Sequence, residues 1–129
     1  MRKTPETNGR SVLLVDDEDI ITDIVGARLR ASGFDVTVSR NGLEALDSVA
    51  DRHPDLIITD MRMPFMGGIE LSRSLASDPA TAAIPVLLLT AASTSHSQCA
   101  PNIRATVRKP FAAEEIVTRS IRLLEGQSA

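Results

Sequence analysis

The segment Asp55–Gly68, DLIITDMRMPFMGG, joins a short apolar run to an acidic residue and then to a loop that contains proline and two glycines. An apolar run of this length, bounded by turn residues, is typical of a strand that is buried on both faces. The segment therefore predicts a strand over Asp55–Asp60, followed by a loop and then by a helix around Ile69–Ser77.

Four further segments of the chain show a strand pattern. The first and fourth strands in chain order are continuously apolar, like the third, as expected for strands that helices cover on both faces. The second and fifth are shorter or alternate between polar and apolar residues, as expected at the edges of a sheet. The four segments are Ser11–Asp16, Phe34–Ser39, Ile84–Thr90 and Arg104–Arg108.

Helix patterns separate these strands. Asn41, with Glu44 three residues later, indicates a capped helix start, and the last helix is expected from Ala112 to Glu125 before Gly126. The apolar residues at helical spacing are Ile21, Ile24, Val25 and Leu29 in the first helix, Leu43, Leu46 and Ala50 in the second, and Val117, Ile121 and Leu124, expected to face inward, in the last.

The alternation of strands and helices predicts an α/β fold, a doubly wound five-stranded parallel sheet with helices on both faces. Its central and edge strands match the 2-1-3-4-5 order of flavodoxin-like folds. We expect a flexible tail over residues 1–9, one domain over residues 10–126 and a short tail over residues 127–129. Residues 92–104 are rich in serine and threonine and contain Pro101, so the fourth helix is expected to be short or irregular.

Composition narrows the possible functions. The chain of 129 residues is 43% hydrophobic, enough for one compact core. Its 17 acidic and 14 basic residues give a net charge of −3, which argues against a nucleic-acid-binding face. The single cysteine, Cys99, cannot form an internal disulfide, and apolar runs are far shorter than the ~20 residues of a membrane-spanning helix. We therefore expect a cytoplasmic protein that contacts neither nucleic acid nor membrane directly.

Polar side chains stand at the carboxyl ends of the expected strands, where ligands bind in sheets of this kind. They are Asp16, Asp17, Asp60, Thr90 and Lys109. Three carboxylates placed close together repel each other unless one takes up a proton or a cation lies among them. Oxygen ligands favour a hard ion, and Mg²⁺ suits a site that leaves room for water and phosphate oxygens.

The same residues point to phosphoryl transfer. Asp60 is a candidate carboxylate nucleophile of the kind that forms an aspartyl phosphate. Lys109 and Mg²⁺ would supply positive charge, and Thr90 a hydrogen bond to a phosphoryl oxygen. The alternative is that Asp16 and Asp17 are only a charged pair at a helix N-terminus. Asp60, at the end of the neighbouring strand, favours the cation site.

Four motifs follow each other in the chain at these strand ends: LLVDDE (Leu13–Glu18), TDMRMPFMGG (Thr59–Gly68), LLLTA (Leu87–Ala91) and RKPF (Arg108–Phe111). With these motifs, residues 10–126 resemble the response-regulator receiver family of two-component signalling. The resemblance implies a stand-alone, single-domain phosphoacceptor protein that is not an enzyme beyond its own phosphorylation and autodephosphorylation. It would act through phosphorylation-dependent partner binding or phosphotransfer.

The resemblance also assigns roles to residues. It implies that Asp60 is the phosphoacceptor and that Asp16, Asp17, Asp60 and the backbone carbonyl of Arg62 hold Mg²⁺. It implies that Lys109 contacts the phosphoryl group and that the peptide bond between Lys109 and the following proline is cis. The donor would be a sensor histidine kinase or a histidine phosphotransfer protein, and the downstream protein target is unknown.

Two departures from the family pattern affect the expected behaviour. Thr106 occupies the place, three residues before Lys109, where the family usually has an aromatic residue that reports the movement of the threonine. Arg62 and Ala92 stand two residues beyond Asp60 and Thr90, where side chains border the phosphoryl group. Arg62 would shield it, and Ala92 offers no hydrogen bond to an attacking water, so we expect slow autodephosphorylation.

Two other classes of protein share part of this pattern. A haloacid-dehalogenase-like phosphatase also forms an aspartyl phosphate, but it needs a second aspartate two residues after the nucleophile, where this chain has Arg62. The other is a degenerate receiver that serves as a phosphorylation-independent interaction module. Thr106 is weakly in favour of that alternative, whereas the complete acidic set, Thr90 and Lys109 argue against it.

Overall fold

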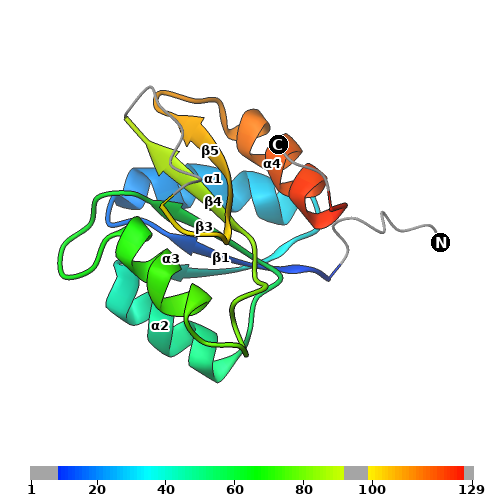
Figure 1. Cartoon of the computed structure of the whole chain (residues 1–129). Coiled ribbons are helices and arrows are strands. Elements are labelled where there is room, and N and C mark those ends of the chain that lie inside the picture. The colour runs from blue at the N-terminus through cyan, green and yellow to red at the C-terminus, as the bar shows by residue number, and fades with distance from the viewer. Residues whose placement is uncertain (1–8, 92–98, 127–129) are drawn as a thin grey trace.

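The computed structural model describes residues 9–91 and 99–126, which form a parallel sheet with helices on both of its faces (Figure 1). The elements in chain order are β1 (Ser11–Val15), α1 (Asp19–Ala31), β2 (Asp35–Ser39), α2 (Gly42–Asp51), β3 (Leu56–Asp60), α3 (Gly68–Ala76), β4 (Val86–Thr90), β5 (Ile103–Arg108) and α4 (Ala113–Leu124). The five strands pair in the order β2-β1-β3-β4-β5, and all pairs are parallel. The predicted fold and strand order are confirmed.

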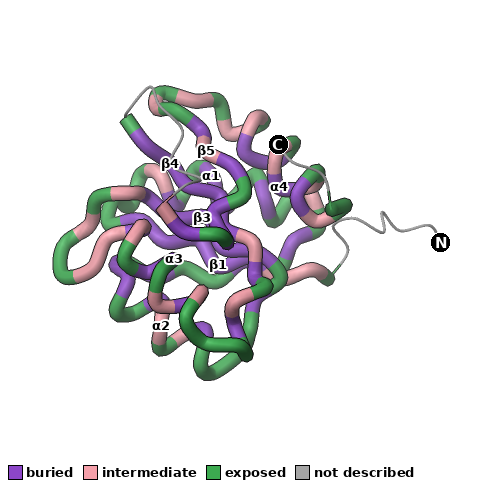
Figure 2. The backbone as a smooth tube through the Cα atoms, viewed as in Figure 1, coloured by how far each residue is buried: buried purple, intermediate pink, exposed green. Residues whose placement is uncertain are grey.

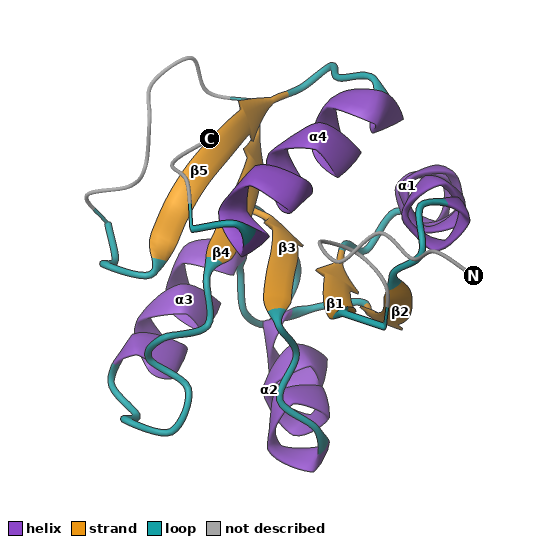
Figure 3. Ribbon diagram, turned by 90° about the vertical axis from the view of Figure 1, so that its right-hand side faces the viewer, coloured by secondary structure: helices purple, strands orange, loops and turns teal. Residues whose placement is uncertain are grey.

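The helices divide into two pairs, one on each face of the sheet (Figure 3). On one face α1 and α4 pack on a core that includes Leu14 and Ile58. On the other face α2 and α3 pack on a core that includes Leu13 and Ile57. Neighbouring residues of one strand thus belong to different cores, so the inner strands are buried throughout (Figure 2).

The helix boundaries follow the local signals in the sequence. The Asn41 side chain accepts a hydrogen bond from the Glu44 backbone N–H at 2.9 Å and so caps α2, as predicted. Gly126 follows α4 with a φ of 84°, a left-handed conformation that glycine adopts without strain.

The helix faces differ in part from the sequence-based expectation. Val25 and Leu29 of α1 are buried as expected, but Ile24 is 53% exposed, and Leu43 at the start of α2 is 49% exposed. In α4 Val117 is buried as expected, and Ile121 and Leu124 pack against the same core but are only partly buried. The buried face of α4 also includes Ile116, Ser120 and Leu123. The buried faces of α1 and α2 also include the small or polar residues Thr22, Gly26 and Ala45.

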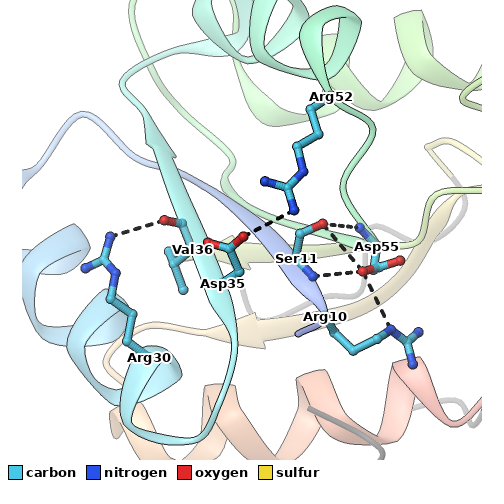
Figure 4. Close-up of polar contacts among 7 residues, drawn as sticks. All are labelled: Arg10, Ser11, Arg30, Asp35, Val36, Arg52 and Asp55. Carbon is cyan, nitrogen blue, oxygen red and sulfur yellow. Dashed lines mark hydrogen bonds and ion pairs between the residues drawn. The ribbon is translucent and has the colours of Figure 1, made fainter. Parts of the chain in front are cut away.

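Side chains tie together the amino ends of the strands, at the rim opposite to the motifs (Figure 4). The Ser11 backbone N–H donates to Asp55 Oδ2 at 2.8 Å, and Arg10 Nε lies 3.6 Å from the same oxygen. Arg52, which follows α2, pairs with Asp35 of β2 at 3.2 Å. These contacts are largely exposed and give modest stabilisation, but they fix the entry into β1, β2 and β3.

Three predictions concern residues outside the described part of the chain. The expected tails fall mostly on residues 1–8 and 127–129, and the irregular fourth helix falls mostly on residues 92–98. In the described residues between β4 and β5 there is no helix. The described helices also include none that is long and apolar enough to cross a bilayer.

Candidate functional site

The three predicted carboxylates meet at the carboxyl rim of the sheet. Asp16 and Asp17 directly follow β1, and Asp60 ends β3. Because β1 and β3 are neighbours, with Val15 opposite Thr59, the chain order brings Asp16 next to Asp60. One carboxylate oxygen from each of the three residues lies within 4.8 Å of the others. Asp16 and Asp60 are buried, whereas Asp17 is exposed.

Lys109 extends from the end of β5 into this acidic cluster. Its Nζ lies 2.9 Å from Asp60 Oδ1, 3.7 Å from Glu18 Oε1 and 3.9 Å from Asp16 Oδ2. The Lys109 backbone N–H donates to the Thr90 carbonyl oxygen at 2.8 Å, and the peptide bond to Pro110 is cis, as the resemblance implied. The single ammonium group therefore contacts Asp60 directly and reaches toward two more carboxylates.

An open pocket lies beside Asp60 and has a volume of about 400 Å³. Thr90, at the end of β4, is buried in its wall, and its hydroxyl donates to Met61 Sδ at 3.6 Å. Arg62 is exposed and lines the same pocket. The lining residues are Asp60, Met61, Arg62, Thr90, Ala91 and Lys109. Ala92, the other predicted neighbour, lies outside the described residues.

Burial and charge shift the protonation of two groups in the site. Burial raises the pKa of Asp16 to about 6. The Glu18 backbone N–H donates to Asp16 Oδ1 at 2.9 Å and opposes this rise, whereas the nearby Asp60 charge adds to it. Burial lowers the pKa of Lys109, but its hydrogen bond to Asp60 and the surrounding negative charges outweigh burial, so the net shift is upward. Lys109 is therefore a cation at neutral pH, and Asp16 is ionised at a cost.

The donor set fits a divalent, oxygen-seeking cation. Asp16 Oδ2 is buried and has no hydrogen-bond partner among the residues that the structure describes. A buried carboxylate oxygen without a partner is unfavourable, and a coordinated cation would remove that penalty. Three carboxylates, with no nitrogen or sulfur donor in the cluster, are the ligand type of Mg²⁺ and not of zinc or copper.

The comparison with known families agrees with this geometry. A family model for the response regulator receiver domain matches residues 12–120. The chain belongs to the response regulator receiver family. This receiver is therefore a signal-transduction module of two-component systems, as the four motifs implied.

Relatives and solved structures support the same conclusion. The receiver is 34% identical over 114 residues to the phosphate regulon transcriptional regulatory protein PhoB of Pseudomonas aeruginosa, over 86% of this chain and 50% of PhoB. It is 37% identical over 82 residues to the polar-differentiation response regulator DivK of Brucella ovis, over 64% of this chain and 67% of DivK. The chain thus spans about half the length of PhoB.

Two solved receiver domains match nearly the whole chain. The signal receiver domain of a histidine kinase from Syntrophus aciditrophicus superposes with a TM-score of 0.83 at 31% identity, over 92% of each chain. The receiver domain of sensor histidine kinase PA1611 from Pseudomonas aeruginosa has a magnesium ion coordinated in its active-site cleft. It superposes with a TM-score of 0.80 at 26% identity, over 92% of this chain and 99% of that one.

Some residues of the site were not identified from the sequence. Glu18 follows Asp17 directly but was not predicted to contact Lys109, and no role at the site was predicted for Met61. At Thr106, where the family's aromatic residue is missing, Arg119 Nη1 of α4 donates to the backbone oxygen at 3.3 Å. Such contacts join elements that are distant in the chain, and spacing along the sequence does not indicate them.

Proposed function

We propose that this receiver accepts a phosphoryl group on Asp60 in a Mg²⁺-dependent reaction and acts through phosphorylation-dependent partner binding or onward phosphotransfer. The observation that carries the proposal is the position of Asp60. Its carboxylate lies at an open pocket, 2.9 Å from the Lys109 ammonium and within 4.8 Å of the Asp16 and Asp17 carboxylates. A structural aspartate would not need this combination of access, acid cluster and cation.

The residues divide the work of phosphoryl transfer between them. A carboxylate oxygen of Asp60 forms the new bond to phosphorus as the bond from phosphorus to the donor breaks. Asp16, Asp17, Asp60 and the backbone carbonyl of Arg62 would hold Mg²⁺, which supplies positive charge to the phosphoryl oxygens. Lys109 neutralises charge from the other side, and the Thr90 hydroxyl donates to a phosphoryl oxygen.

The donor is proposed to be a histidine kinase or a histidine phosphotransfer protein that docks on α1. Ile20 and Ile24 are one helical turn apart and are 65% and 53% exposed. Beside α1 lies a hollow of about 340 Å³, which is lined by Ile21, Lys109, Pro110 and Phe111. Because Lys109 lines both the hollow and the phosphoryl pocket, an apolar surface that binds here would place a phosphohistidine close to Asp60.

Incubation with Mg²⁺ and a small acyl phosphate donor tests the phosphoacceptor role. We expect mass spectrometry to show one added phosphoryl group in the wild type and in Asp47→Asn, a matched change on the surface of α2, but not in Asp60→Asn. Chelation of Mg²⁺ should prevent the modification. If neither the small donor nor a cognate kinase phosphorylates the wild type, the receiver is instead a phosphorylation-independent interaction module.

A further inference from the structure

Met61, the residue directly after the phosphoacceptor, contacts the threonine that phosphorylation is proposed to recruit. Its Sδ accepts a hydrogen bond from the Thr90 hydroxyl at 3.6 Å. Both residues line the pocket that contains Asp60, and β3 and β4 are hydrogen-bonded neighbours, with Asp60 opposite Leu89. The sulfur therefore holds the Thr90 hydroxyl within the site itself.

The main chain fixes the position of Met61 on both sides. Its N–H donates to the Leu89 carbonyl oxygen at 2.9 Å, and its own carbonyl oxygen accepts from the Gly68 N–H at 2.9 Å. A Cβ atom on Gly67 would press against the same Met61 oxygen, so this turn closes only because residue 67 is glycine. The Met61 side chain is partly buried and packs against the core under α2 and α3. The backbone at Met61 is therefore held on both sides, and its partly buried side chain carries the sulfur to the Thr90 hydroxyl.

A thioether is a weak hydrogen-bond acceptor, whereas a phosphoryl oxygen carries charge and accepts strongly. Resting on the proposed phosphorylation of Asp60, we propose that Met61 is a positioning residue, which holds the Thr90 hydroxyl in the unphosphorylated receiver and competes with the phosphoryl group for it. The weakness of the sulfur as an acceptor decides the outcome of this competition. It orients the hydroxyl at rest and yields it when a phosphoryl oxygen arrives on Asp60.

Changing the acceptor should change the phosphorylation rate. Met61→Leu keeps the volume of the side chain but removes the sulfur, so we expect the rate constant for modification by a small acyl phosphate to rise about two- to fivefold. Met61→Gln offers a stronger acceptor, and the rate constant should fall by a similar factor. Met63→Leu is the matched control, because Met63 is in the same loop and is also partly buried on the same core but does not line the pocket that contains Asp60.

A double-mutant cycle separates this role from simple packing. Thr90→Val removes the hydroxyl and keeps the shape, so in that background Met61→Leu should leave the remaining rate unchanged. An equal factor in both backgrounds, or no effect of either Met61 variant on the wild-type background, would overturn the role of Met61. A wild type that is not phosphorylated at all would overturn the proposed function and this inference with it. The two failures are thus distinguishable in one set of measurements.

Discussion

Replacing Asp16 with asparagine is expected to stabilise the cation-free receiver at neutral pH. The Asp16 side chain is fully buried, and burial raises its pKa from 3.8 to about 6. A shift of about 2 pH units corresponds to about 3 kcal/mol, at 1.36 kcal/mol per unit. Because asparagine can still accept the hydrogen bond from the Glu18 N–H without carrying a charge, we expect Asp16→Asn to gain about 1–3 kcal/mol.

The pH dependence has an unusual sign for a carboxyl group. The folded state holds the Asp16 proton more tightly than the unfolded chain, so the free energy of unfolding falls as the pH rises from 3.8 to about 6. The penalty is absent below this window and complete above it. Mg²⁺ bound among the carboxylates would replace the proton, so it should stabilise the wild type mainly above pH 6 and Asp16→Asn little at any pH.

Urea unfolding between about pH 4 and pH 8, in EDTA and in Mg²⁺, measures these differences. Asp17→Asn is the matched control, because Asp17 belongs to the same cluster but is exposed and should change the stability in EDTA only slightly. If Asp16→Asn and the wild type were equally stable in EDTA at pH 8, or differed by the same amount at every pH, the argument from the buried charge would be refuted.

Three further predictions concern residues around the site. Arg62 is exposed beside Asp60, so Arg62→Asn should shorten the phosphoryl half-life about fivefold, equivalent to the ~1 kcal/mol of an exposed charge pair; an unchanged decay after donor removal would contradict this. Phe65 has a φ of 69°, which glycine adopts without strain, and its side chain is 84% exposed. Phe65→Gly should therefore raise the free energy of unfolding by about 1 kcal/mol in urea titrations; a lower free energy of unfolding would show that the ring is structurally needed. Replacing Ile20 and Ile24 with serine should slow phosphorylation by a histidine kinase about tenfold, with a much smaller effect on small-donor kinetics; equal slowing of both would argue against docking on α1.

The sequence predicts the sheet and the acid cluster because both depend on regular geometry. Buried parallel strands have long apolar runs, and the residues that follow such runs meet at one rim, so Asp16 and Asp60 could be placed together before any coordinates. The face of a helix is harder to predict when its apolar residues are not confined to one stripe. In α1 the buried face holds Thr22 and Gly26 beside Val25 and Leu29, whereas the apolar Ile24 lies outside it and is exposed, so residue type alone does not mark the buried face.

The charge balance at this rim is consistent with the proposed divalent cation. Asp16, Asp17 and Asp60 together carry three negative charges when ionised, and Lys109 neutralises one of them. The two that remain would match one divalent ion, and such an ion would also coordinate Asp16 Oδ2, a buried oxygen that accepts no hydrogen bond from the described residues. Without the ion, protonation of Asp16 would remove both the cost of burying its charge and the smaller repulsion from Asp60, in agreement with its raised pKa. Such an ion would also make Asp60 approachable for a phosphoryl group, because two anions would otherwise have to meet in a partly buried pocket.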